Sequence, residues 1–109
     1  MSPSRPRAHA AHQAFDAPTP SQAADAQLLA DLRQGDRAAC VPLMRKYSRL
    51  MFGAARSILK DDAQAEHAVQ EAWLRAFAAL HSFRADDGLP VWLVRIVMRQ
   101  ARLQLHQHP

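Results

Sequence analysis

The chain has 109 residues, a length that suits one domain and excludes a large multidomain enzyme. Its 14 Lys and Arg residues exceed its 10 Asp and Glu residues, which gives a net charge of +4, and about half of the residues are apolar. The single cysteine, Cys40, excludes a disulfide framework and a paired-cysteine metal site. No apolar run approaches the roughly 18–20 residues that a membrane span needs, so we expect no membrane partner.

Residues 1–21 are predicted to form a disordered tail. Four of the seven prolines lie in this stretch, among Ser, Ala, His and Gln residues. Only Phe15 offers much apolar surface, so burial cannot offset the entropy of ordering the segment. A single helical domain is expected over residues 22–109. The chain start is basic but lacks the apolar core of a signal peptide, so we do not expect export.

From residue 22 the apolar residues follow a helical period. The apolar face of the first predicted helix consists of Leu28, Leu29 and Leu32, and either Ser21 or Asp25 lies near its start. Gly35 is placed to end this helix, and Asp36 is expected to cap a second one that continues to about residue 59. Pro42 lies about six residues into the second helix, where it either kinks the helix or marks the start of its regular part.

A third helix is predicted from about residue 62 to residue 82, with Asp61 or Asp62 as its cap. A loop follows over residues 82–89, with the turn-forming residues Asp86, Asp87 and Gly88. Pro90 suits the first position of a fourth helix that runs to about residue 105. No segment shows the alternating pattern of a strand, so the expected fold is an all-α, compact four-helix domain.

The polar face of the third predicted helix gathers four side chains into one patch, namely Glu66, His67, Gln70 and Glu71. Two carboxylates and an amide suit recognition of basic side chains on a partner helix. The alternative is an ordinary solvated face, in which Glu71 pairs with Arg75 one turn along the helix.

The fourth predicted helix carries a row of basic residues: Arg95, Arg99, Arg102 and His106. Such a row on an otherwise apolar helix can follow a phosphate backbone, although arginine at a helix C-terminus also favours the helix dipole. Trp92 lies one turn earlier and is either a core residue or a stacking surface for an unpaired base.

The loop over residues 81–90 mixes an aromatic residue, a base, two acids and a glycine, which suits an extruded nucleotide as well as an ordinary helix connection. No catalytic constellation emerges elsewhere, because the cysteine has no nearby histidine and no glycine-rich phosphate loop is present. The six histidines lack the spacing of a metal site. We therefore expect no enzyme activity, no cofactor and no metal.

Three stretches together resemble region 2 of the bacterial extracytoplasmic-function sigma factors. The first includes Asp25, Leu28, Gly35, Asp36, Ala39, Leu43 and Tyr47. The second, Ala65-Glu66-His67-Ala68-Val69-Gln70-Glu71-Ala72-Trp73-Leu74-Arg75-Ala76, is similar to the motif Ala-Glu-Asp-x-Val-Gln-Glu-x-Phe-Leu-Arg-Ala of that family. The third, Phe83-Arg84 and then Trp92-Leu93-Val94-Arg95-Ile96, is similar to its Phe-Arg and Trp-Leu-x-Arg-Ile motifs.

This resemblance implies a transcription initiation factor. In such factors the Gln-Glu helix binds the clamp helices of the RNA polymerase β′ subunit, a role that carries over to Glu66, Gln70 and Glu71, with His67 in place of the usual Asp. The following loop and the last helix bind the single-stranded non-template strand of the promoter −10 element and hold one base in a loop pocket. The expected DNA-binding residues are Phe83, Arg84, Trp92, Arg95, Arg99 and Arg102.

Beyond Ile96 the residue-by-residue resemblance ends. The usual Asn of the family is Arg99 here, its Asp is Leu103, and its final Arg pair is His106-Gln107. A complete factor also has a second helical domain, region 4, which reads the −35 element and for which this chain has no room. The chain is expected to be a fragment of a longer factor or a stand-alone region 2 protein, and a lone region 2 loses the affinity that linked modules gain.

Three functions therefore stay open. The first is an initiation factor that is monomeric, cytoplasmic and bacterial, and that opens the −10 element while bound to RNA polymerase core. The second is a truncated or stand-alone sigma-like module that binds polymerase or an anti-sigma factor without initiating transcription. The third is a generic helical DNA-binding protein, for which the charge alone argues.

Overall fold

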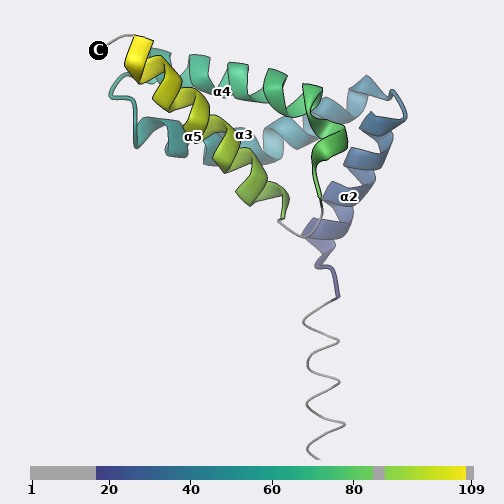
Figure 1. The fold of residues 1–109 in the computed structure, drawn as a ribbon. Coiled ribbons are helices and arrows are strands. Elements are labelled where there is room, and N and C mark those ends of the chain that lie inside the picture. Colours follow the sequence, from purple (N-terminus) through teal and green to yellow (C-terminus); the bar gives the residue numbers. More distant parts are fainter. Residues whose placement is uncertain (1–16, 85–87, 108–109) are drawn as a thin grey trace, which may run out of the picture.

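A computed structural model of the chain describes residues 17–84 and 88–107. Its elements are the helices and turns α2 (Pro20–Arg33), η1 (Arg37–Ala39), α3 (Cys40–Arg56), α4 (Asp62–Ala78), η2 (Leu80–Ser82) and α5 (Leu89–Gln107). Figure 1 shows α3, α4 and α5 packed together, with α2 set at an angle at one end. The expected all-α architecture with four main helices is confirmed over the described residues. None of the helices in those residues is both long and apolar enough to span a membrane.

Helix α2 begins at Pro20, two residues before the start that the sequence pattern predicts. Thr19 is its N-cap: the Thr19 hydroxyl accepts a hydrogen bond from the Gln22 backbone N–H at 3.0 Å. The Gln22 side-chain oxygen in turn accepts from the Thr19 N–H at 2.8 Å, which completes a capping box. At the other end Gly35 stops the helix as expected, with a φ of 94° that favours glycine.

Asp36 caps the η1 turn that leads directly into α3. Its carboxylate accepts a hydrogen bond from the Ala38 N–H at 3.1 Å. Pro42 is the third residue of α3. A proline so close to a helix start removes an N–H that has no partner within the helix, so of the two predicted alternatives the one that places the regular start near Pro42 is confirmed.

Helix α4 starts after Asp61, which is its N-cap but makes no side-chain capping bond. Asp62 instead pairs with the Arg56 guanidinium at 2.8 Å. The predicted end of this helix near residue 82 is wrong, because the chain tightens into the η2 turn after Ala78. Helix α5 begins at Leu89, one residue earlier than predicted, while the predicted turn residues Asp86 and Asp87 lie outside the described residues.

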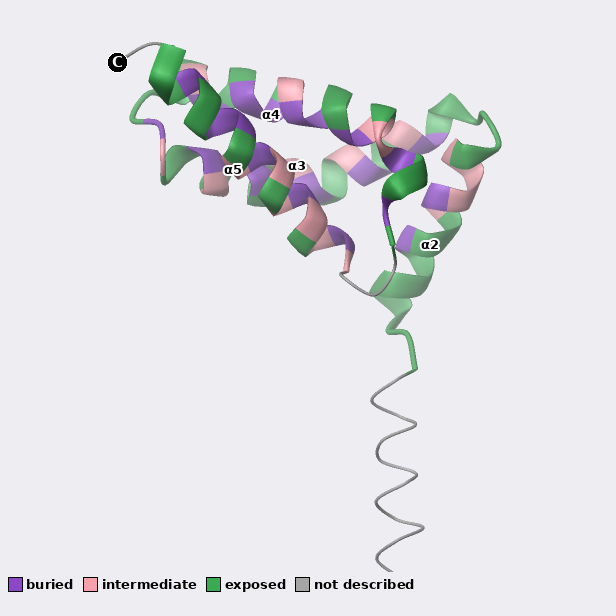
Figure 2. Ribbon diagram, in the orientation of Figure 1, coloured by how far each residue is buried: buried purple, intermediate pink, exposed green. Residues whose placement is uncertain are grey.

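The core lies between α3, α4 and α5, and Figure 2 shows their buried faces turned toward one another. Its largest fully buried side chains are Leu43, Met51, Leu59, Leu93 and Val97. Helix α4 contributes mainly small residues to this core, at helical spacing: Ala65, Ala68, Ala72 and Ala76. Small side chains let the neighbouring helices come close, which fixes where the opposite, polar face of α4 is presented.

A buried polar cluster attaches α2 to α3. Asp25 is only 5% exposed, and its carboxylate accepts hydrogen bonds from the Tyr47 hydroxyl and from the Lys46 ammonium, the latter at 2.8 Å. Lys46 also donates to the Ser21 carbonyl at 3.2 Å. A carboxylate buried in this way is stable because it is both paired and hydrogen-bonded. Burial, the hydrogen bond to Asp25 and the negative charge of Asp25 together raise the pKa of Tyr47 to about 12.

We expect the only tyrosine of the chain to titrate far above its usual pKa of 10.0. A near-ultraviolet absorbance titration of the folded chain should reach its midpoint near pH 12, and the same titration in denaturant should reach it near pH 10. The folded pKa is the higher one, so the contribution of Tyr47 to stability is complete below about pH 10 and is lost as the pH rises to about 12.

The Tyr47→Phe variant is the control that isolates the phenol, because it keeps the ring and removes only the hydroxyl. Its stability should fall less steeply with pH than that of the unaltered chain. Equal midpoints in the folded and denatured chain would contradict the buried Asp25–Tyr47 contact.

Candidate functional site

The predicted polar patch on α4 is a solvent-facing surface. Glu66, His67 and Gln70 are exposed and Glu71 is half-buried; these four residues are called the α4 patch. The alternative of an ordinary solvated face agrees with this exposure, but its Glu71–Arg75 ion pair does not form, and the Arg75 Nε donates to the Gln100 side chain at 2.9 Å. Within the described part of the chain no side chain forms an ion pair with either carboxylate of the α4 patch, so both face solvent with their charge available.

Leu74 extends the α4 patch by one helical turn and was not among the predicted site residues. Its side chain is 63% exposed, more than any other large apolar residue in the described chain. It lies four residues after Gln70, on the same side of α4, while the next residue back, Trp73, is buried. The sequence contains a signal for this residue, because the helical period places Leu74 on the polar face of α4, where a large apolar side chain is exposed to solvent.

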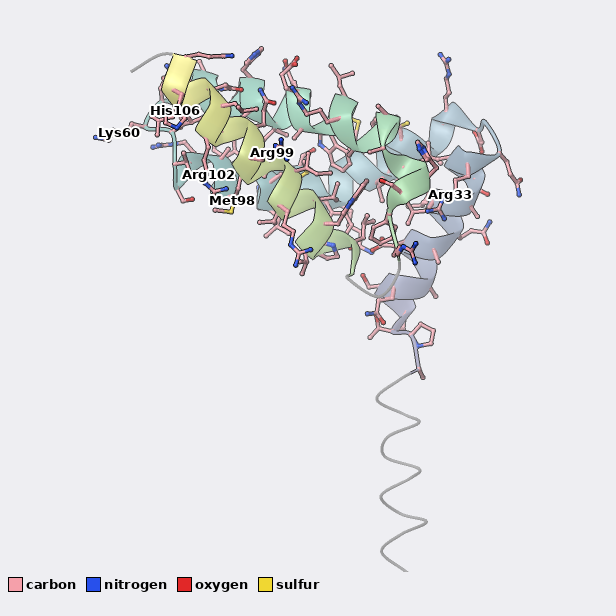
Figure 3. The ribbon with its side chains drawn as sticks, in the orientation of Figure 1. Arg33, Lys60, Met98, Arg99, Arg102 and His106 are labelled. Atoms are coloured by element: carbon pink, nitrogen blue, oxygen red, sulfur yellow. The ribbon has the colours of Figure 1, made fainter. Side chains whose placement is uncertain are left out.

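The predicted basic row is exposed along α5. Figure 3 shows Arg99, Arg102 and His106 following one another along this helix, and Arg95 is exposed as well. The figure also shows Lys60, from the loop between α3 and α4, at the same end of the molecule as His106. Sequence reasoning missed Lys60, because only the fold brings that loop to the end of α5.

A chain of hydrogen bonds fixes how α5 is rotated against α4. Arg75 donates to the Gln100 side chain, the Gln100 amide donates to the Gln104 side chain at 3.3 Å, and the Gln104 amide donates to the Gln64 carbonyl at 2.9 Å. Gln100 and Gln104 are 8% and 5% exposed. Buried amides are costly unless they are hydrogen-bonded, so this chain specifies one rotation of α5, the one that turns its arginines outward.

The aromatic pair before and within α5 is part of the packing. Phe83 is buried, and its ring lies against that of Trp92 with the centroids 5.0 Å apart and the planes at 52°. Trp92 is half-buried, so it packs on the core and still presents part of its ring. Of the other predicted DNA-binding residues, Arg84 is exposed. The structure therefore brings the aromatic pair to one place and the arginines of α5 to a neighbouring one.

A cavity of about 410 Å³ is lined by Phe83, one member of the aromatic pair. One wall is the N-terminal half of α2, and the other is made by Phe83, Gly88, Leu89 and Pro90. Asp25 and Tyr47 also line it, so the cavity is largely apolar with a few polar groups. Concave sites of this character are typical for small or planar ligands. Over the described residues, no group of His, Cys, Asp and Glu side chains is arranged to hold a metal ion.

Residues 43–108 match the Sigma-70 region 2 family. The chain belongs to this family. As a sigma region 2 domain it is 33% identical over 85 residues to the RNA polymerase sigma-H factor of Pseudomonas aeruginosa, an alignment that covers 78% of this chain and 44% of the relative. It is 39% identical over 74 residues to the ECF RNA polymerase sigma factor SigM of Mycobacterium tuberculosis, covering 68% and 38%.

A third relative, the ECF RNA polymerase sigma-E factor of Haemophilus influenzae, is 29% identical over 82 residues, which cover 74% of this chain and 42% of the relative. The chain thus spans about four-tenths of the length of these curated relatives. The resemblance to extracytoplasmic-function sigma factors is confirmed, and sigma factors are non-enzymatic transcription initiation factors.

Replacing Gln104 should show how much the α4–α5 hydrogen-bond chain contributes to this sigma domain. Gln104→Ala leaves the Gln64 carbonyl and the Gln100 amide without their partner, so the free energy of unfolding should fall by about 1–3 kcal/mol in a urea titration. Gln107→Ala is the control, because it removes an exposed amide from the same helix and should change stability by less than about 0.5 kcal/mol. Equal stability of the two variants would mean that the buried amides do not hold α5.

Proposed function

We propose that this chain is the part of a transcription initiation factor that binds RNA polymerase core and the promoter −10 element. The observation that carries the proposal is the α4 patch: three of its residues, Glu66, Gln70 and Glu71, match the Gln-Glu motif of the family, and the patch is presented on a helix whose opposite face is buried. The basic row of α5 supplies a second surface of opposite charge. Two such surfaces on adjoining helices suit a protein that holds a partner on one side and nucleic acid on the other.

The polymerase side is the α4 patch together with Leu74. Glu66 and Glu71 suit a partner helix that carries Arg or Lys, such as the clamp helices of the β′ subunit. Leu74 adds an apolar contact next to these charges, and protein interfaces combine apolar with polar contacts. His67 stands where the family usually has Asp, so this surface presents one carboxylate fewer to the partner.

The DNA side is the row Arg95, Arg99 and Arg102. These arginines span about 10 Å along the axis of α5, a length suited to several successive phosphates of one strand. Lys60, which lies at the same end of the molecule as His106 in Figure 3, continues the positive surface at the far end of the helix. Phosphate contacts position a strand and do not read its sequence. Selectivity for an opened −10 element is therefore assigned to the cavity lined by Phe83, as the acceptor of one unpaired base.

A second candidate function is a sigma-like module that binds polymerase or an anti-sigma factor without opening promoters. It is favoured by Leu103, which is 41% exposed at the position where the family has Asp. Leu105, 45% exposed, lies nearby on the same helix. Exposed leucines among the arginines make the end of α5 better suited to a protein surface than to a phosphate backbone. This candidate predicts polymerase or anti-sigma binding without measurable binding of single-stranded DNA.

The double variant Gln70→Ala with Glu71→Ala should bind RNA polymerase core at least about tenfold more weakly, a loss of about 1.4 kcal/mol. The reason is that it removes one carboxylate and one amide from the centre of the α4 patch. The measurement is a fluorescence-anisotropy titration with bacterial core enzyme. The matched control, Gln34→Ala with Asp61→Asn, truncates one exposed amide side chain and neutralises one exposed carboxylate outside the patch. Unchanged binding by the patch variant would remove the assigned interface.

The double variant Arg95→Ala with Arg99→Ala should bind single-stranded DNA more weakly and with a shallower dependence on salt. The slope of log K against log salt should fall by about 0.7 for each phosphate that the variant no longer neutralises. Arg45→Ala with Arg49→Ala removes the same charge from the exposed face of α3 and should leave the slope nearly unchanged. If both double variants alter the slope equally, only the net charge matters and α5 is not the DNA surface.

A further inference from the structure

Arg33 joins the end of α2 to the turn that follows α4. Its Nη2 atom donates to the Leu80 carbonyl at 3.1 Å and to the Phe83 carbonyl at 3.3 Å. These contacts cross 47 and 50 residues of sequence, and Figure 3 shows Arg33 where α2 comes alongside η2. The Leu80 carbonyl also accepts a hydrogen bond from the Phe83 backbone N–H at 3.2 Å, and a carbonyl oxygen has a second lone pair that a guanidinium N–H can use.

The position of this contact relates it to the cavity. The α2 wall includes Asp25 and Leu29, and the facing wall includes the Phe83 ring. Arg33 lies on α2 one turn beyond Leu29 and holds the Phe83 backbone directly. The distance between the α2 wall and the Phe83 wall of the cavity therefore depends on the Arg33 side chain, which connects them.

The rest of the fold does not depend on this contact. Leu80 and Phe83 are anchored in the core by their own burial, and the Phe83 ring also packs on Trp92. The other half of α2 is held through Asp25, Lys46 and Tyr47. Removing the Arg33 guanidinium should therefore leave the helices folded while it frees the backbone of Phe83 relative to α2.

We propose that Arg33 is a positioning residue, which sets the width of the cavity between α2 and Phe83 so that it grips one unpaired base of single-stranded DNA. This proposal rests on the proposed function, which makes that base the ligand of the cavity. Arg33 does not touch the base in this arrangement. It acts through the two carbonyls that it holds, and it leaves the phosphate contacts of α5 unaffected.

The test separates the affinity that comes from binding one base from the affinity that comes from binding the phosphate backbone. The probe is a fluorescent single-stranded DNA decamer selected from a random pool by the unaltered chain, with each nucleotide replaced in turn by an abasic one. The unaltered chain should lose about tenfold or more in affinity at one position, the loss expected when a stacked base is removed. For Arg33→Gln the intact strand should bind as weakly as that abasic strand, and the abasic strand should bind as it does to the unaltered chain.

A conservative substitution of Arg33 should weaken base binding only in part. Arg33→Lys keeps the charge but replaces the planar fork with a point charge, so it should show an intermediate ratio between intact and abasic strands. This variant also gives the test a folded protein if Arg33→Gln loses its helical circular dichroism signal. The matched control is Arg37→Gln, which removes the same charge from an exposed side chain in the next element and should keep the full ratio.

Three outcomes would overturn the proposal. A full intact-to-abasic ratio in both Arg33 variants would show that the contact does not control the cavity. An equal loss of affinity for intact and abasic strands would show a general structural effect. No sensitive position in the unaltered chain would overturn the base-binding cavity itself, and with it the proposed role of Arg33, whereas the polymerase interface on α4 would stand.

Discussion

The contact between α4 and α5 is the constraint on which both charged surfaces depend. Each helix has one face in the core and one in solvent, so any rotation about its axis would bury charge and expose apolar surface. Alanines on α4 allow a close approach, and the bonded amides of Gln100 and Gln104 select one rotation out of those that packing alone permits. The acidic patch and the basic row therefore keep a fixed relation without touching each other.

The long helices were predictable from the sequence because their period is a local property. The leucine spacing and Gly35 located α2, and the apolar stripe located α4 and α5 to within a few residues at most ends. The errors fall where a short-range detail decides the end of a helix. Thr19 starts α2 earlier through a reciprocal cap, and the η2 turn ends α4 early by changing the hydrogen-bond pattern.

The candidate site was predictable to the extent that it lies on single helix faces. Periodicity was enough to place Gln70 and Arg99 in solvent. It also places Leu74 on the exposed face of α4, so this residue could have been predicted. What it could not supply were contacts across the fold. Arg75 takes a partner 25 residues away and not the one next to it, and Arg33 reaches a turn 47 residues away. Such pairings depend on the packed geometry, which no local pattern encodes.

The attachment of α2 has a further consequence for the energy landscape of the domain. This helix fully buries only Asp25 and Leu29, with Leu28 and Leu32 partly buried against the core, whereas α3, α4 and α5 each bury more residues. Detaching α2 therefore exposes less apolar surface than detaching any of those three helices, which makes it the least costly partial unfolding of the fold. Native-state hydrogen exchange in α2 would then proceed through this local opening, and its rate would depend less on denaturant than the exchange rate in α3–α5. Because α2 forms one wall of the cavity, each opening would also remove the cavity.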